Sequence, residues 1–134
     1  MSIKKLTLYL TTVIFLFSIA CKDQPKEDLS TIQMVSPNEM EELIKIESTQ
    51  LVDVRTEKEF ASGHIEGAHN IVYDEHFIEK LASLDKSKPV AVYCHSGGRS
   101  EKCAKILKEA GFKKIYDLKG GITQWVYHKK DTIK

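Results

Sequence analysis

Residues 94–100 combine a cysteine, two glycines, an arginine and two serines in the short stretch CHSGGRS. A cysteine thiolate is a strong nucleophile, and it is favoured where N–H groups and positive charge converge on the sulfur. Glycine tolerates positive φ and close approach of the backbone, so we expect both Gly97 and Gly98 to shape such a cradle. Arg99 adds a charge that does not titrate in the physiological range. The stretch therefore predicts that Cys94 is a nucleophile with a lowered pKa.

The segments on either side of this stretch indicate how it is held. PVAVYC, residues 89–94, has the continuous apolar character of a strand buried on both faces. RSEKCAKILKEAG, residues 99–111, has helical spacing, and Gly111 is placed to end the helix. A loop leading into a helix turns several N–H groups toward one point, where the helix N-terminus adds partial positive charge. We therefore expect Cys94 at the carboxyl end of a buried strand.

The rest of the domain alternates strand-like and helix-like segments. Further strands are expected at 31–35, 51–55, 68–72 and 114–118, and further helical segments at 36–46, 56–65, 74–84 and 120–130. This order predicts an α/β fold, a mostly parallel five-stranded sheet with helices on both faces. In such sheets ligands gather at the carboxyl ends of the strands, where Cys94 is expected.

Apolar side chains at helical spacing indicate which helix faces are buried. In the first helix, a capping box from Ser36 to Glu39 precedes the expected core residues Met40, Leu43, Ile44 and Ile46. In the segment 74–84 the expected core residues are Phe77, Ile78, Leu81 and Leu84, and in the last helix Trp125 is expected to be buried.

Composition excludes several classes of function. The chain has 134 residues, room for one domain with a modest core, and its 20 basic and 19 acidic residues give a net charge of +1. With no block of like charge, no nucleic-acid partner is expected. His64 and His69 lack a set of cysteines or carboxylates at metal-ligand spacing, so no metal site is expected.

The N-terminus has the pattern of an export signal. Lys4 and Lys5 precede LTLYLTTVIFLFSIA, residues 6–20, which carries no charge. This run is shorter than the roughly 20 residues that a membrane-spanning helix needs. The pattern predicts a cleaved signal peptide over residues 1–20, with an uncleaved membrane anchor as the alternative.

The junction FSIAC resembles a bacterial lipobox, although Ser18 stands where leucine is usual. The resemblance implies lipidation of Cys21 after cleavage, and hence an exported protein anchored to a bacterial membrane, at the periplasmic face or the cell surface. CKDQPKEDLS, residues 21–30, is polar and is expected to be a tether. The folded domain is then expected over residues 31–130.

Three stretches in the expected order resemble the single-domain rhodaneses, a family of sulfurtransferases. The active loop of that family runs Cys-x-x-Gly-x-Arg-Ser or Thr, and the chain matches it at Cys94, Gly97, Arg99 and Ser100. LVDVRTEKEFASGHIEGAHNI, residues 51–71, and AGFKKIYDLKGGITQW, residues 110–125, resemble two further stretches of the family. The resemblance covers residues 32–127 and implies a rhodanese-like fold.

The resemblance also implies a reaction. Cys94 would take a sulfane sulfur from a donor such as thiosulfate, become a persulfide, and pass the sulfur to cyanide or a thiol. The implied substrate-binding loop is His95, Ser96, Gly97, Gly98, Arg99 and Ser100. Asp53 and Arg55 are implied to be a structural polar pair supporting the loops. No metal or organic cofactor is implied, and a monomer suffices.

Departures and alternatives remain open at this point. His95 stands where many members carry arginine, which implies weaker thiosulfate binding, and Val72 stands where proline is frequent. Phosphatases and arsenate reductases with a cysteine and an arginine typically have five residues between them, against four here. An inactive rhodanese-like binding module usually lacks the cysteine. Cys103 fits core packing or a resolving thiol, and Ser100 fits a helix N-cap or a donor to the bound sulfur.

Overall fold

The computed structural model describes residues 31–134. The predicted signal peptide, the lipidated Cys21 and the tether concern residues 1–30 and lie outside the described residues. Within residues 31–134, no helix combines the length and apolarity needed to cross a membrane.

Five parallel strands form a single sheet. They are β1 (Thr31–Val35), β2 (Gln50–Asp53), β3 (His69–Asn70), β4 (Val90–Tyr93) and β5 (Lys114–Leu118). Their order across the sheet is β1-β5-β4-β2-β3, and every pair of neighbours is parallel. The predicted α/β fold with a five-stranded sheet is confirmed. β4, which leads to Cys94, lies at the centre, where both of its edges are paired.

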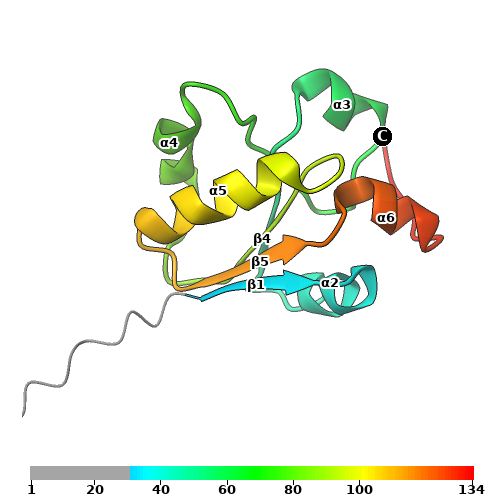
Figure 1. Ribbon diagram of the computed structural model, residues 1–134, viewed down its shortest axis with the longest axis horizontal. Helices are drawn as coiled ribbons and strands as arrows, with labels where there is room; N and C mark the ends of the chain where they lie inside the picture. The colour runs from blue at the N-terminus through cyan, green and yellow to red at the C-terminus, as the bar shows by residue number, and fades with distance from the viewer. Residues whose placement is uncertain (1–30) are drawn as a thin grey trace, which may run out of the picture.

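Helices cover both faces of the sheet, as Figure 1 shows. One face is covered by α2 (Pro37–Ile44) and α6 (Gly121–Tyr127), and the other by α4 (Phe77–Lys80), a 3₁₀ turn (Leu81–Ser83) and α5 (Gly98–Glu109). The short helix α3 (Glu57–Ser62) follows β2. The predicted capping box at Ser36 is present, with the Ser36 side chain accepting from the Glu39 N–H and the Glu39 carboxylate accepting from the Ser36 N–H.

The core has two halves because successive strand residues point to opposite faces. On β4, Val90 and Val92 pack with the α4 and α5 side, whereas Ala91 and Tyr93 pack with the α2 and α6 side. All four are fully buried, as the continuous apolar run predicts. Trp125 is buried in the second half, also as predicted.

Two predicted core residues are exposed. Ile46 is 53% exposed because α2 ends at Ile44 and its C-cap Lys45, so the helical spacing does not extend to position 46. Ile78 is 68% exposed because the segment 74–84 is a single helical turn followed by a 3₁₀ turn. Phe77 and Leu81 are buried as predicted, and Leu84 packs against the same core while partly buried.

Several predicted elements are shorter in the structure, most clearly the helix at 74–84 and the strand at 68–72. The helical segment starts at Phe77, because the Asp74 carboxylate accepts a hydrogen bond from the His76 N–H at 3.0 Å and holds a turn there. β3 has two residues rather than the five of 68–72, since it pairs with β2 only through His69 and Asn70.

Candidate active site

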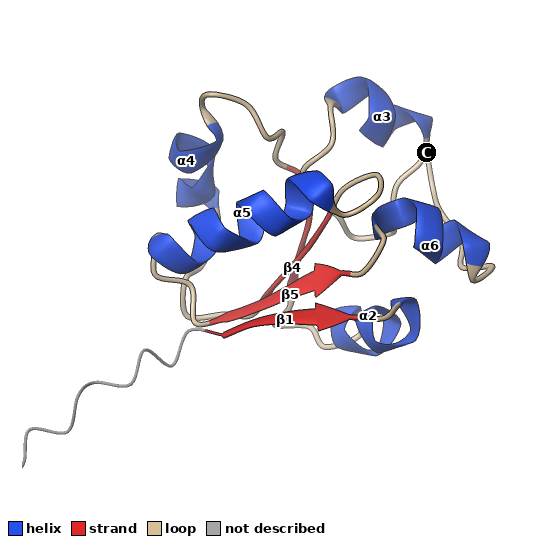
Figure 2. Cartoon of the chain, in the orientation of Figure 1, coloured by secondary structure: helices blue, strands red, loops and turns tan. Residues whose placement is uncertain are grey.

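Cys94 lies directly after β4, at the carboxyl end of the central strand. Figure 2 shows the loop that joins β4 to α5 on this side of the sheet. The Gly97 N–H donates to the Cys94 Sγ at 3.0 Å. The Cys94 residue is only 1% exposed, so the sulfur lies under its own loop rather than on the open surface. Hydrogen-bond donors of the loop therefore surround the sulfur.

The electrostatics of the loop favour the thiolate. Burial opposes the charged form and is the largest single influence on the pKa of Cys94. Against it act the Ser100 N–H, the Ser100 hydroxyl, the Gly97 N–H and the Ser96 N–H, all of which stabilise the sulfur anion. Together they outweigh burial, and the pKa of Cys94 lies below the ordinary value of a thiol.

Only one of the two loop glycines has the backbone conformation that the sequence analysis expected. Gly97 has φ 111°, a value that side chains with a Cβ rarely adopt, and it precedes α5 as its N-cap. Gly98 is the first residue of α5 and lacks a positive φ, so the expectation of a positive φ at Gly98 is wrong. Because Gly97 is the N-cap, Ser100 is not; it lies inside the first turn of α5, fully buried.

Arg99 is held by a partner that the sequence analysis did not identify. Its Nη1 and Nη2 each donate to a carboxylate oxygen of Glu59, at 2.8 Å. Glu59 also caps α3, where its carboxylate accepts from the N–H and hydroxyl of Thr56. The Arg99 hydrogen bond is the largest influence holding the pKa of Glu59 far below its usual range. The capping box of Thr56 and Glu59 is local, whereas the contact between Glu59 and Arg99 joins positions 40 residues apart, so local sequence patterns do not indicate it.

Glu59→Gln is expected to lower the free energy of unfolding by about 1 kcal/mol at pH 7, because a half-buried bidentate pair contributes on this scale. Glutamine retains a capping side chain, so α3 persists. Since the pKa of Glu59 is depressed in the folded state, the pair stabilises above the unfolded pKa and loses its effect as the pH falls below about 4.

Urea unfolding at pH 7 and at acid pH measures this difference. Glu57→Gln, on the same first turn of α3 but exposed, is the matched control and is expected to change stability by less than about 0.5 kcal/mol. Equal effects of the two substitutions would contradict a specific contribution from the Arg99 pair.

The start of α6 fixes the loop backbone from the other side. The Ile122 N–H donates to the Cys94 carbonyl at 2.9 Å, and the Thr123 N–H donates to the His95 carbonyl at 3.1 Å. The Thr123 hydroxyl donates to the same carbonyl at 2.9 Å. The side chains of His95 and Ser96 are exposed at the mouth of the loop. The backbone around Cys94 is therefore held by both α5 and α6.

Asp53 and Arg55 form a buried ion pair at the carboxyl end of β2. The Arg55 Nη2 donates to the Asp53 carboxylate at 2.6 Å and to the Gly63 carbonyl at 2.8 Å. The guanidinium also lies 5.7 Å from the centre of the Tyr93 ring. Asn70 donates to the carbonyls of both Asp53 and Arg55. The pair thus ties β2 to the end of α3 and to β3, and neither side chain hydrogen-bonds to Cys94.

Cys103 and the two histidines lie apart from the loop chemistry. Cys103 is fully buried in the core, and burial, followed by the proximity of Cys94, raises its pKa to about 12. A thiol with this pKa is a poor nucleophile, which favours the packing alternative. The His64 ring stacks on Phe60 with centroids 3.7 Å apart, and His69 is exposed on β3. In the described part of the chain, no three histidine, cysteine or acidic residues are grouped so as to hold a metal ion.

Comparison with known proteins gives a consistent result. The profile of the rhodanese-like domain family matches residues 36–128. A protein of Shewanella oneidensis named thiosulfate sulfurtransferase GlpE is 33% identical over 97 residues, which cover 72% of this chain and 95% of that protein. A second protein of the same name, from Pseudomonas aeruginosa, is 33% identical over 96 residues, covering 71% and 84%.

Solved structures share the fold. A rhodanese-related protein from Thermoplasma volcanium superposes with a TM-score of 0.68 at 29% identity, covering 75% of this chain and 97% of that one. A rhodanese-like domain protein from Staphylococcus aureus gives a TM-score of 0.62 at 29% identity, covering 69% and 90%. With the family profile spanning α2 to α6, including four of the five strands and the cysteine loop, the chain belongs to the rhodanese-like domain family, which includes thiosulfate sulfurtransferases.

Proposed function

We propose that this protein is a sulfurtransferase that carries a sulfane sulfur on Cys94 from a small donor, such as thiosulfate or a persulfide, to cyanide or a thiol. The proposal is carried by one observation, the set of hydrogen-bond donors around the Cys94 sulfur. These donors stabilise an anion at that point, and both the resting thiolate and the persulfide are anions.

Each half of the reaction balances without a cofactor. The Cys94 thiolate attacks the outer sulfur of thiosulfate, a new S–S bond forms, and the old S–S bond breaks with its electron pair leaving on sulfite. The acceptor then attacks the outer sulfur of the persulfide, and the S–S bond breaks with its electron pair returning to Cys94. When the acceptor is cyanide, the product is thiocyanate, and the Cys94 thiolate is restored. The negative charge moves outward by one sulfur atom and back, within reach of the same N–H groups.

The burial of Cys94 and the exposure of His95 bear on the donor. With the sulfur only 1% exposed, a slim donor with a terminal sulfur fits the loop better than a bulky one. The exposed residue next to Cys94 is His95, where many members of the family carry arginine, a permanent cation. We therefore expect weak binding of thiosulfate, which carries two negative charges.

The phosphatase or arsenate-reductase alternative is less well supported. Those reactions need an arginine that clamps a tetrahedral oxyanion above the cysteine. Here both terminal nitrogens of Arg99 donate to Glu59 instead. The inactive binding module is less well supported because Cys94 retains its complete set of donors.

The test is sulfur transfer by the purified full-length protein. With thiosulfate and cyanide we expect thiocyanate to form, and with thiosulfate alone the intact mass should rise by one sulfur atom. Cys94→Ser is expected to abolish both signals, since serine cannot form a persulfide. Cys103→Ala is the matched control and should retain both, because Cys103 is a buried thiol with a high pKa. Absence of a mass increase with thiosulfate and with persulfide donors, while Cys94 is reduced, would overturn the proposal.

A further inference from the structure

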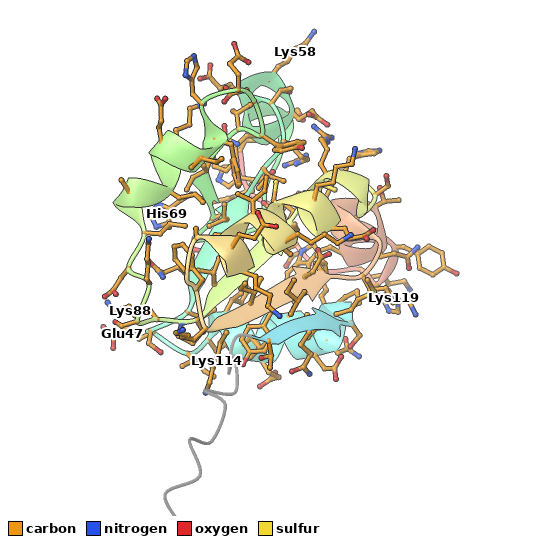
Figure 3. All side chains as sticks on the ribbon, turned by 60° about the vertical axis from the view of Figure 1, so that its left-hand side comes forward. Glu47, Lys58, His69, Lys88, Lys114 and Lys119 are labelled. Atoms are coloured by element: carbon orange, nitrogen blue, oxygen red, sulfur yellow. The ribbon has the colours of Figure 1, made fainter. Side chains whose placement is uncertain are left out.

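Asp117 is a buried acid that the sulfur chemistry, as described so far, does not use. It lies near the end of β5, at only 2% exposure, on the face that carries Ile115 and packs against α5. Figure 3 labels Lys114 at the start of this strand and Lys119 just past its end, on opposite sides of the molecule. Asp117 therefore stands at the active-site end, behind the loop.

This carboxyl group is poorly satisfied. Its Oδ1 is buried with no hydrogen-bond partner, a costly arrangement for a charged oxygen. Across the sheet, its register partners are Val92 on β4 and Met34 on β1, neither of which carries a charge or a polar hydrogen in its side chain. α5 packs against β5, and the Ser100 hydroxyl, fully buried on the first turn of α5, lowers the pKa of the Asp117 carboxyl, although its hydrogen bond in the structure is to the Gly97 carbonyl.

The Ser100 hydroxyl has one proton and several acceptors around it. It lies 3.1 Å from the Gly97 carbonyl, to which it donates in the structure. It also stabilises the Cys94 sulfur anion and the Asp117 carboxylate. A single O–H serves only one of these acceptors fully at a time. A protonated Asp117 does not compete, because it can donate its own proton to the Ser100 oxygen.

The other titratable groups near Asp117 favour its neutral form. Burial is the largest influence, Glu101 on α5 adds repulsion, and together they raise the pKa of Asp117 to about 6 against the opposing effect of Ser100. Cys103, also on α5, interacts with both Asp117 and Cys94, and Arg99 is the cation among the charged groups that act on Cys103. With a pKa of about 6, Asp117 changes charge between about pH 5 and pH 7.

We propose that Asp117 is a positioning residue that acts on Cys94 through Ser100. When Asp117 is protonated, the Ser100 hydroxyl is free to donate to the sulfur anion. When Asp117 is ionised, the hydroxyl turns to the carboxylate and the sulfur loses a donor. The same reasoning applies to the Cys94 persulfide, whose formation rests on the proposed function. The persulfide anion is held more firmly when Asp117 is protonated, and its outer sulfur is released more easily when Asp117 is ionised.

The test is the pH dependence of Cys94 alkylation, which requires no sulfur transfer. The full-length protein is treated with iodoacetamide from pH 5 to 9, and the peptide containing Cys94 is quantified by mass spectrometry. Asp117→Asn mimics the protonated acid, since its amide can donate to Ser100. We expect it to lower the apparent pKa of Cys94 by about one unit, a roughly tenfold larger thiolate fraction at pH 7. The wild-type curve of alkylation against pH should be broadened, because Asp117 and Cys94 titrate together. The curve of Asp117→Asn should follow the titration of a single group.

A double-mutant cycle separates the hydroxyl from a simple effect of charge. In the Ser100→Ala background, Asp117→Asn is expected to change the thiolate fraction of Cys94 by less than about threefold. Glu109→Gln, which removes an exposed charge at the far end of α5, is the matched control and should leave the curve shape unchanged. An Asp117→Asn effect of equal size with and without the Ser100 hydroxyl, or no effect at all, overturns the proposal, whatever the outcome of the sulfur-transfer assay.

Discussion

Asp53→Ala is expected to lower the free energy of unfolding by about 3–5 kcal/mol, because it leaves the buried Arg55 guanidinium without its counter-charge. Arg55 is only 4% exposed and would keep only the Gly63 carbonyl and the face of Tyr93 as partners. For a domain of this size such a loss corresponds to a fall in melting temperature of about 15–30 °C. Urea and thermal unfolding of the purified protein measure it.

The paired variant Asp53→Leu with Arg55→Met tests the reason for the loss. If the uncompensated charge is the cause, removing both charges should restore most of the stability, short of the hydrogen bond to Gly63. Asp53→Ala with a loss below about 1 kcal/mol would contradict the argument. Because Arg55 holds the end of α3, and α3 carries the Glu59 that holds Arg99, the single variant should also loosen the active loop.

The fold was predictable because its strongest signals are local. β1 and β5 have the predicted bounds, and α5 ends before Gly111, whose φ is 97°, as its position indicated. The failures at Ile46 and Ile78 have one physical cause. Helical spacing predicts a buried side chain only while the helix continues, and its length depends on end effects that apolar spacing does not show. The order of the strands, with β5 inside the sheet, was not predicted, since it depends on long-range packing.

In the candidate active site, too, local features were predictable from the sequence and contacts between distant elements were not. The loop residues Ser96, Gly97 and Ser100 were predictable as donors to Cys94 because they lie next to it in sequence, and Ser100 acts through its hydroxyl as well as its N–H. Glu59 and Asp117 were not identified, because each reaches the loop from another element of the fold. An acidic residue in a first helical turn or at the end of a strand has many uses, so its type and position do not identify its partner. Only the three-dimensional arrangement brings these two carboxyl groups to the loop.

Gly121→Ala is expected to disrupt the loop that holds Cys94. Gly121 has φ 60°, and a Cβ there would lie 2.4 Å from the Cys94 carbonyl oxygen and 2.6 Å from that of His95. Both contacts are with backbone, so the side chain has no way to avoid them except by moving the loop or α6. We expect a loss of about 2–4 kcal/mol in the free energy of unfolding. Even a small displacement of the Cys94 sulfur relative to the N–H groups around it should reduce the rate of sulfur transfer by about a hundredfold.

Gly111→Ala separates backbone strain from steric contact. Gly111 also has a positive φ, 97°, but a Cβ there would meet nothing within 4 Å, and it lies at the far end of α5. We expect Gly111→Ala to destabilise by about 1–2 kcal/mol and to leave sulfur transfer per folded molecule unchanged. If both variants lost activity equally, global stability rather than the α6 contact would set the geometry of the loop. If only Gly121→Ala loses activity, as we expect, the start of α6 is part of the structure that positions Cys94. Its N–H groups bond to the loop carbonyls, and the lack of a Cβ at Gly121 lets those carbonyls approach closely.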